Sequence, residues 1–364
     1  KALSPAEAAG SPPASAGDQT PTPDAPATAV AAIAPDAGLA GAPDAERLIE
    51  TEIIPTLDRL ANTALTLQNA VLRHCLVGHA VTRDALEPAY SYAIEASAAV
   101  LPLSFGSEEA VAAPDRLLTT AVSTAFSTSK LEAVMQGAAP VPRSLKELAN
   151  EEAALLGLPA LEILLLRRSY PSDFLLDNRC TLAVPVAASI VDTAVRARAR
   201  WLNRDVAAHW QGDQAELAPR LRLRDLVQGT IDTVDRVALD LVNFQRMATD
   251  KSAFRFTRPR HGLVYLIAAA EALRVHVQRL AVFAKPDSGA AVLLGEIGDA
   301  LTVSCVRLLA IATGEADDGA YLIAFEQAHG DIINELPQAF GFDASAFTRA
   351  LTSIDMPRAA AEEP

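Results

Sequence analysis

The sequence is poor in aromatic residues, and this shortage limits the fold classes that the chain can adopt. Phe, Trp and Tyr make up 5% of the 364 residues, whereas half of the residues are apolar and Ala and Leu dominate. β-Branched and aromatic residues both favour strands, and runs of β-branched residues are also few in this sequence. Ala and Leu favour helices. The composition therefore predicts an all-α protein.

Cysteine is scarce as well. Only Cys75, Cys180 and Cys305 are present, far apart in the chain. They can form at most one disulfide and would then leave one thiol over. Because free cysteine is among the most buried residue types, we expect all three to be small core residues.

Long apolar runs and positive charge are also lacking. No apolar run reaches the roughly 18 residues that a membrane span needs, so we expect no transmembrane segment. The chain has 31 Lys and Arg against 45 Asp and Glu, a net charge of −14. This charge argues against nucleic acid, and against an anionic membrane surface, as a partner.

The short motifs of several enzyme classes are missing. The sequence has no His-Glu-x-x-His, no Cys-x-x-Cys, no Gly-rich phosphate loop and no Gly-x-Ser-x-Gly. His74 and His79 lie five residues apart, too far around a helix to share one ligand. Cys75 and His79 share a helical face, as do Asp205 and His209, but a core thiol and a local ion pair are the simpler interpretations. None of these residues predicts a metal site.

Residues 1–43 contain hardly any large apolar side chain and consist mainly of Ala, Pro, Ser, Gly, Thr and Asp. Such a segment cannot bury enough surface to offset its ordering entropy. We expect a disordered tether. The chain starts at Lys1 without an apolar signal region, which fits a processed, exported protein whose tail holds it off a membrane or wall.

From residue 44 onward, apolar residues recur at three- and four-residue spacing, which is typical of amphipathic helices. The predicted helices cover about 44–71, 84–100, 115–135, 144–157, 178–210, 223–242, 261–282, 290–311, 319–335 and 344–352. Gln211-Gly212-Asp213 break the longest one. Short connections and the lack of strand alternation predict two packed up-and-down bundles, 44–211 and 212–357.

One short stretch, Gly157-Leu158-Pro159-Ala160-Leu161-Glu162, combines unusual features. Gly157 can end a helix in the left-handed conformation, and Pro159 suits the first turn of the next helix. Glu162 then falls near the start of a largely buried helix. A carboxylate there needs a partner, such as a buried Arg, the first-turn amides or a metal ion.

This stretch resembles the motif of the imelysin family, bacterial envelope proteins also called M75 peptidase-like. Their motif is Gly-x-His-x-x-Glu, and many members have Gly-Leu-Pro-Ala-Leu-Glu-Tyr-Leu-Leu. Gly157 and Glu162 match, whereas Pro159 occupies the position of the His. Weaker resemblance extends over about residues 45–350. It implies two helical bundles with the motif in the cleft between them, in the periplasm or outer envelope.

The resemblance also implies a ligand site. Glu162 would be a metal ligand, for iron or another divalent metal, and Gly157 and Pro159 would belong to the same site. Arg258 and Arg260 lie in a loop that, by the resemblance, points toward the cleft. Guanidinium groups bind carboxylates in a bidentate manner, so these two suit an anionic ligand such as an acidic sugar or a carboxylate chelate.

Three functions remain open from the sequence. The first is a non-catalytic periplasmic protein that binds a metal or a metal-bearing or anionic ligand in the interdomain cleft and serves iron uptake. The second is a metal-dependent peptidase. The third is a helical scaffold whose tail positions the bundles for an envelope protein partner. A metal site needs several ligands, and Pro159 has no donor atom in its side chain, so we favour the first function, while peptidase activity stays an open alternative.

Overall fold

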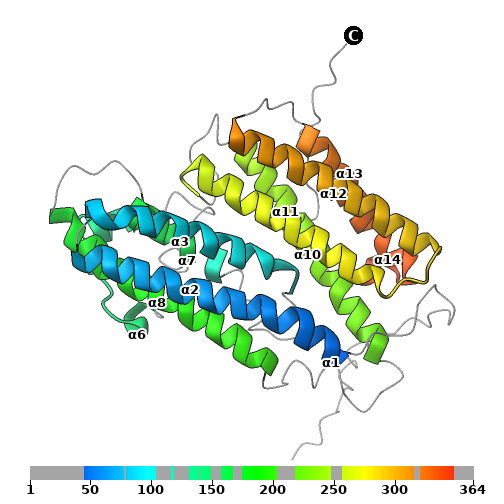
Figure 1. The fold of residues 1–364 in the computed structure, drawn as a ribbon, viewed down its shortest axis with the longest axis horizontal. Coiled ribbons are helices and arrows are strands. Elements are labelled where there is room, and N and C mark those ends of the chain that lie inside the picture. Colours follow the sequence, from blue (N-terminus) through cyan, green and yellow to red (C-terminus); the bar gives the residue numbers. More distant parts are fainter. Residues whose placement is uncertain are drawn as a thin grey trace, which may run out of the picture. The chain divides into compact units, whose positions relative to one another are not determined.

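The computed structural model describes residues 45–77, 79–103, 116–118, 131–138, 140–148, 157–166, 174–202, 218–246, 256–314 and 320–347. Within these ranges every element is a helix and there is no strand (Figure 1). The predicted all-α fold is confirmed. The tail predicted to be disordered, residues 1–43, lies outside the described residues.

The first group of helices packs around α2. It comprises α1 (Ala45–Leu48), the π-helical η1 (Ile49–Ile53), α2 (Ile54–Val77), α3 (His79–Ala99) and α8 (Phe174–Leu202). α2 packs against both α3 and α8 (Figure 1). Its buried stripe includes Leu57, Leu60, Leu67 and Val71, at the helical spacing seen in the sequence. Pro55 lies in the first turn of α2, where its missing N–H is tolerated.

The second group comprises α10 (Ala218–Arg246), α11 (Pro259–Ala281), α12 (Gly289–Thr313) and α13 (Ala320–Asn334). α11 packs on α10 and α12, and α13 packs on α12 and α10. Both ends of α12 are capped. Ser288 accepts a hydrogen bond from the N–H of Ala291, and Gly314 ends the helix in the left-handed conformation.

Short elements complete the described chain. They are η2 (Leu101–Leu103), α6 (Leu145–Leu148), α7 (Gly157–Leu161), the π-helical η5 (Glu162–Leu166), α14 (Leu336–Ala339) and η6 (Ala344–Ala346). α7 and η5 together carry the motif stretch, and both contact α8.

α11 also packs on α3 and so joins the two groups of helices. Near the end of α11, Arg279 pairs with Glu52 of η1. Residues 35–364 form one compact unit by their contacts. The boundary expected between residues 211 and 212 falls in the range 203–217, outside the described residues, so the division into two domains stays a prediction.

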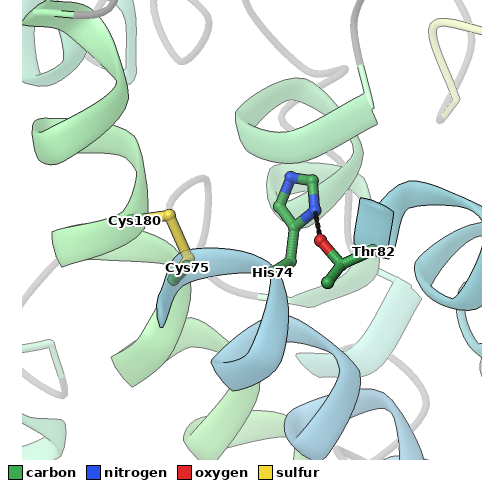
Figure 2. Close-up of a disulfide and its surroundings, with 4 residues drawn as sticks. All are labelled: His74, Cys75, Thr82 and Cys180. Carbon is green, nitrogen blue, oxygen red and sulfur yellow. Dashed lines mark hydrogen bonds between the residues drawn. A yellow bond between two sulfur atoms is a disulfide. The ribbon is translucent and has the colours of Figure 1, made fainter. Parts of the chain in front are cut away.

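Cys75 and Cys180 form a disulfide with a Cα–Cα distance of 5.5 Å (Figure 2). It joins the end of α2 to the start of α8. Beside it, Nδ1 of His74 lies 2.9 Å from Oγ1 of Thr82, a contact between α2 and α3. The expectation that all three cysteines are buried core residues is wrong, because Cys75, Cys180 and Cys305 are all partly exposed. Helix packing brings Cys75 and Cys180 together although they are 105 positions apart in the chain. Cys305 is free.

Two helical segments of the described chain, Asn178–Leu202 and Gly289–Thr313, are long and apolar enough to cross a membrane by length and composition. Each buries part of that length against neighbouring helices. Core helices of soluble proteins pass the same test, so this is weak evidence for a membrane span.

Candidate functional site

Glu162 is fully buried, and its carboxylate accepts hydrogen bonds from the segment that begins α11. Oε2 accepts from the backbone N–H of Thr257 (2.5 Å) and from the Thr257 hydroxyl (2.9 Å). Oε1 accepts from the backbone N–H of Arg258 (3.2 Å) and from Nδ1 of His261 (2.5 Å). A carboxylate offers about four lone-pair directions. Protein donors therefore use the full capacity of Glu162.

The backbone around Gly157 fixes where Glu162 lies. Gly157 has φ +82°, and a Cβ there would lie 2.7 Å from the carbonyl oxygen of Leu117. Only glycine fits both restrictions, and the left-handed conformation expected for Gly157 is confirmed. The chain then continues as α7 and changes to the π-helical η5 at Glu162. π-helical turns are frequent at functional sites.

The start of α11 supplies a favourable environment for the negative charge of Glu162. Arg258 is the N-cap with an extended backbone, and Pro259 occupies the first turn. The two backbone N–H groups that bind Glu162 belong to the residues just before this helix. Backbone N–H groups and the helix dipole both favour an anion at a helix N-terminus.

His261 links Glu162 to α3. Because Nδ1 donates to Glu162, Nδ1 carries a proton. Nε2 is buried and has no hydrogen-bond partner among the described residues. Oε1 of Glu87 on α3 lies 3.9 Å from it. The ring packs against Tyr90 with a centroid distance of 4.9 Å.

Glu87 connects the buried groups to the surface. Its Oε1 accepts a hydrogen bond from Nη1 of Arg258 at 3.0 Å and lies 3.8 Å from Nη1 of Arg260. The Arg258 side chain is 19% exposed, whereas that of Arg260 is 77% exposed. Arg258 is therefore committed to the network, while Arg260 is open to a ligand.

A pocket of about 330 Å³ opens beside Glu87. Its lining residues come mostly from one face of α3, and they are Asp84, Glu87, Pro88, Ser91, Tyr92 and Arg260. Pro88 lies inside α3 and has no N–H for the carbonyl of Asp84, so that carbonyl lacks its helical hydrogen bond. The pocket thus combines a cation, carboxylates, a hydroxyl and an aromatic ring.

Two side chains of α3 hold the motif in place. The Tyr90 hydroxyl donates to the carbonyl of Leu158 (2.8 Å), and Arg83 donates to the carbonyl of Leu166 (3.2 Å). Burial raises the pKa of Tyr90 well above its usual value, with a further contribution from the charge of Glu162. Tyr90 is therefore a neutral hydrogen-bond donor at physiological pH.

The structure divides the predicted site residues into two sets. Glu162, Arg258 and Arg260 meet at one junction, although only Arg260 lines the pocket. Gly157 and Pro159 are buried beneath it and position the motif. In the described part of the chain no group of three His, Cys, Asp or Glu side chains is placed to hold a metal ion. Glu162 as a metal ligand stays a prediction.

Sequence reasoning missed His261, Thr257 and Glu87 as site residues. The segment Thr257-Arg258-Pro259 carries a recognisable helix-start signal, since Pro is frequent in the first turn. Such a start offers donors to a carboxylate, so this signal could have indicated a partner for Glu162. Nothing in the sequence marks Glu87 as a site residue, because only the packing of α3 on α11 brings it next to His261.

The imelysin family model matches residues 53–281, a range that includes the motif and the start of α11. The chain belongs to the imelysin family. No curated protein matches it. Among solved structures, it is similar to an imelysin-like protein from Psychrobacter arcticum 273-4, with 14% identity and a TM-score of 0.61. The match covers 82% of this chain and 95% of that one, and at this identity it shows that the imelysin fold is shared.

Proposed function

We propose that this imelysin-family protein is a non-catalytic envelope protein that binds a metal-bearing anionic ligand and serves iron uptake. The ligand would occupy the pocket beside α3 and α11. The observation that carries the proposal is the state of the motif carboxylate. Both oxygens of Glu162 are engaged by protein donors, so this residue builds the site and has no capacity left for chemistry.

The charged residues at the pocket support a ligand that carries both positive and negative charge. Arg260 presents an exposed guanidinium, which would bind a carboxylate of the ligand. Asp84 and Glu87 line the same pocket and would face a cationic centre. A metal ion held by an organic carboxylate has both features. A bare ion fits less well, because it needs several protein donors, and the described residues do not provide three together.

Peptide hydrolysis is less well supported. A metallopeptidase holds its metal with three protein ligands, leaves one position for water and needs a general base. Glu162 is the carboxylate that the motif would offer as that base. A base must accept a proton from water, and the lone pairs of Glu162 already accept other protons.

The disulfide supports a location outside the cytoplasm. Disulfides persist in oxidising compartments such as the bacterial periplasm and are rare in the cytosol. Cys75 and Cys180 join two helices of the core, α2 and α8. A tail of the composition of residues 1–43 is also consistent with an envelope protein.

The proposal is tested by calorimetric titration of the full chain with ferric citrate, with citrate alone and with zinc and calcium chloride. We expect ferric citrate to bind with micromolar or stronger affinity and citrate alone to bind at least tenfold more weakly. A parallel assay with a mixture of fluorogenic peptides should show no hydrolysis. Failure of ferric citrate to bind, or hydrolysis that a chelator stops, would contradict the proposal.

A further inference from the structure

We infer that the exposed face of α12 binds a second copy of this chain, with the two α12 helices running antiparallel about a two-fold axis. None of the residues that line the pocket beside α3 belongs to α12, so the inference goes beyond the proposed function. The occupant is identified by α12 itself, because its exposed face is complementary to the same face reversed.

This face lies opposite the side of α12 that packs on α11 and α13. The packed side is formed by apolar residues that include Leu294, Ile297, Leu301 and Leu308. On the opposite side, six exposed residues recur at alternating spacings of three and four: Val292, Gly295, Asp299, Thr302, Val306 and Leu309. Residues at this spacing form one stripe along a helix, and it is the spacing found where two helices pack along their length. We call these six residues the α12 stripe.

The α12 stripe exposes more apolar surface than scattered surface residues do. Val292, Val306 and Leu309, with Val303 beside them, are each between 47% and 59% exposed. Although α12 is long and apolar enough to cross a membrane by length and composition, only 39% of its most apolar window is buried inside the protein. A contiguous exposed apolar surface of this kind is typical of an interaction site.

The apolar positions of the stripe match each other when the helix is reversed. If Val292 of one copy faces Leu309 of the second copy, the same register sets Val306 opposite Gly295. A Cβ at Gly295 would meet nothing within 4 Å, so the Val306 side chain has room at that position. Because a two-fold interface repeats every contact, each of these pairs forms twice.

The polar positions match in the same register, which sets Asp299 of one copy opposite Thr302 of the other. The Thr302 hydroxyl donates to the carbonyl of Gly298 within its own helix. A hydroxyl can rotate, so it could donate to the Asp299 carboxylate of the second copy instead. The only charged residue of the stripe would then have a hydrogen-bond partner in the interface.

Charges beside the stripe are complementary as well. In this register Glu296 of one copy comes within a helical turn of Arg307 of the other, and both residues are exposed. Glu296 lies in an acidic region, since burial together with the charges of Glu335 and Glu296 raises the pKa of Asp331 on α13. An arginine from the second copy would offset part of this negative charge.

A second copy therefore fits the whole face better than a lipid surface does. A membrane could cover the valines and Leu309, but it would leave the Asp299 and Glu296 carboxylates against acyl chains, which is unfavourable for unpaired charges. The net charge of −14 also opposes contact with an anionic membrane.

The first test is sedimentation equilibrium of the full chain over a range of micromolar concentrations, where we expect a reversible equilibrium between monomer and dimer. Val306→Glu places a charge in the α12 stripe and should weaken dimerisation about tenfold or more. The control is Leu76→Glu, at the end of α2, because Leu76 is 82% exposed and lies outside α12. It should leave dimerisation unchanged. Circular dichroism checks that each variant is folded.

A charge exchange tests the antiparallel register. Glu296→Arg and Arg307→Glu should each weaken dimerisation, because each change sets like charges opposite one another. In a mixture of these two variants, opposite charges face each other again at both contacts. Native mass spectrometry of the mixture should therefore show heterodimers in clear excess over either homodimer.

Three results would overturn the inference. The first is a chain that stays monomeric at all these concentrations. The second is a dimer that Val306→Glu does not weaken, or a mixture in which heterodimers show no excess. The third is a monomer that floats with phosphatidylcholine vesicles and loses this property in Val306→Glu, which would assign the face to a membrane instead.

Discussion

Glu162 and His261 are 99 positions apart in the chain, yet Oε1 of one lies 2.5 Å from Nδ1 of the other in the protein interior. Both side chains have no solvent exposure. This contact joins the motif, which packs on α8, to the first turn of α11. It makes Glu162 a structural junction between the motif and α11.

Replacing Glu162 by Ala should destabilise the protein strongly. The change removes four hydrogen bonds and leaves the N–H groups of Thr257 and Arg258 without their acceptor. We expect the free energy of unfolding to fall by about 3–5 kcal/mol in urea titrations. The control is Glu95→Ala, which breaks an exposed pair with Arg59 and should cost at most about 1 kcal/mol. Equal effects of the two changes would contradict the role of Glu162 as a junction.

Gly157→Ala should lower the free energy of unfolding more than Gly314→Ala does. Both glycines have positive φ, +82° and +85°. A Cβ at Gly157 would lie 2.7 Å from a backbone oxygen, whereas a Cβ at Gly314 would meet nothing within 4 Å. Gly314→Ala should cost about 1–2 kcal/mol from the backbone conformation alone, and Gly157→Ala clearly more. Chemical unfolding of both variants measures the difference, and similar values would show that the chain relaxes around Gly157.

His276 should make the protein less stable in acid. Burial, with a smaller contribution from Arg279, lowers the pKa of His276 from 6.5 to about 3. Between these values the unfolded chain binds a proton that the folded protein does not, so stability is lost as the pH falls below 6.5. The loss approaches about 1.4 kcal/mol per pH unit from this residue.

The measurement for His276 is the free energy of unfolding between pH 7 and pH 4, with His276→Gln as the control. Nε2 of His276 donates to the carbonyl of Leu226, and Gln can keep a donor there without titrating. The variant should therefore show a shallower dependence on pH. The same slope in both proteins would show that His276 is not responsible.

Removing the disulfide should lower stability. Cys75 and Cys180 are 105 positions apart in the chain, and in the chain-entropy description closing a loop of this length stabilises the folded protein by about 4–5 kcal/mol. The double variant Cys75→Ala with Cys180→Ala should lose much of this stabilisation, whereas Cys305→Ala should keep it. A thiol count under denaturing conditions should rise on reduction from the single Cys305 to all three cysteines. An unchanged count would exclude the disulfide.

Much of the helical fold was predictable from local patterns. The stripe that includes Leu57, Leu60 and Val71 is buried as its spacing indicated. At Ser144, where the predicted helix 144–157 begins, one half of a capping box is formed. Ser144 accepts from the N–H of Glu147 at 3.2 Å, while the Glu147 side chain accepts from the N–H of Arg143 instead. Such features depend on residues within one helical turn of each other, so the sequence alone specifies them.

The site was predictable only in part, because its contacts are long-range. The sequence indicated that Glu162 needs a partner and offered the first-turn amides of its own helix as one candidate. The amides that bind it belong instead to Thr257 and Arg258, just before α11, and this depends on how α11 packs. The pairing of Cys75 with Cys180 and the position of Glu87 beside His261 have the same origin.

The most direct test of the account is the affinity for ferric citrate of Arg260→Ala beside Arg59→Ala. Arg260 is the exposed guanidinium at the pocket, whereas Arg59 is an exposed guanidinium paired with Glu95. The account predicts that Arg260→Ala weakens binding about tenfold or more, as expected for a lost charge-assisted contact, and that Arg59→Ala changes nothing. Unchanged binding in Arg260→Ala would place the ligand elsewhere and contradict the account.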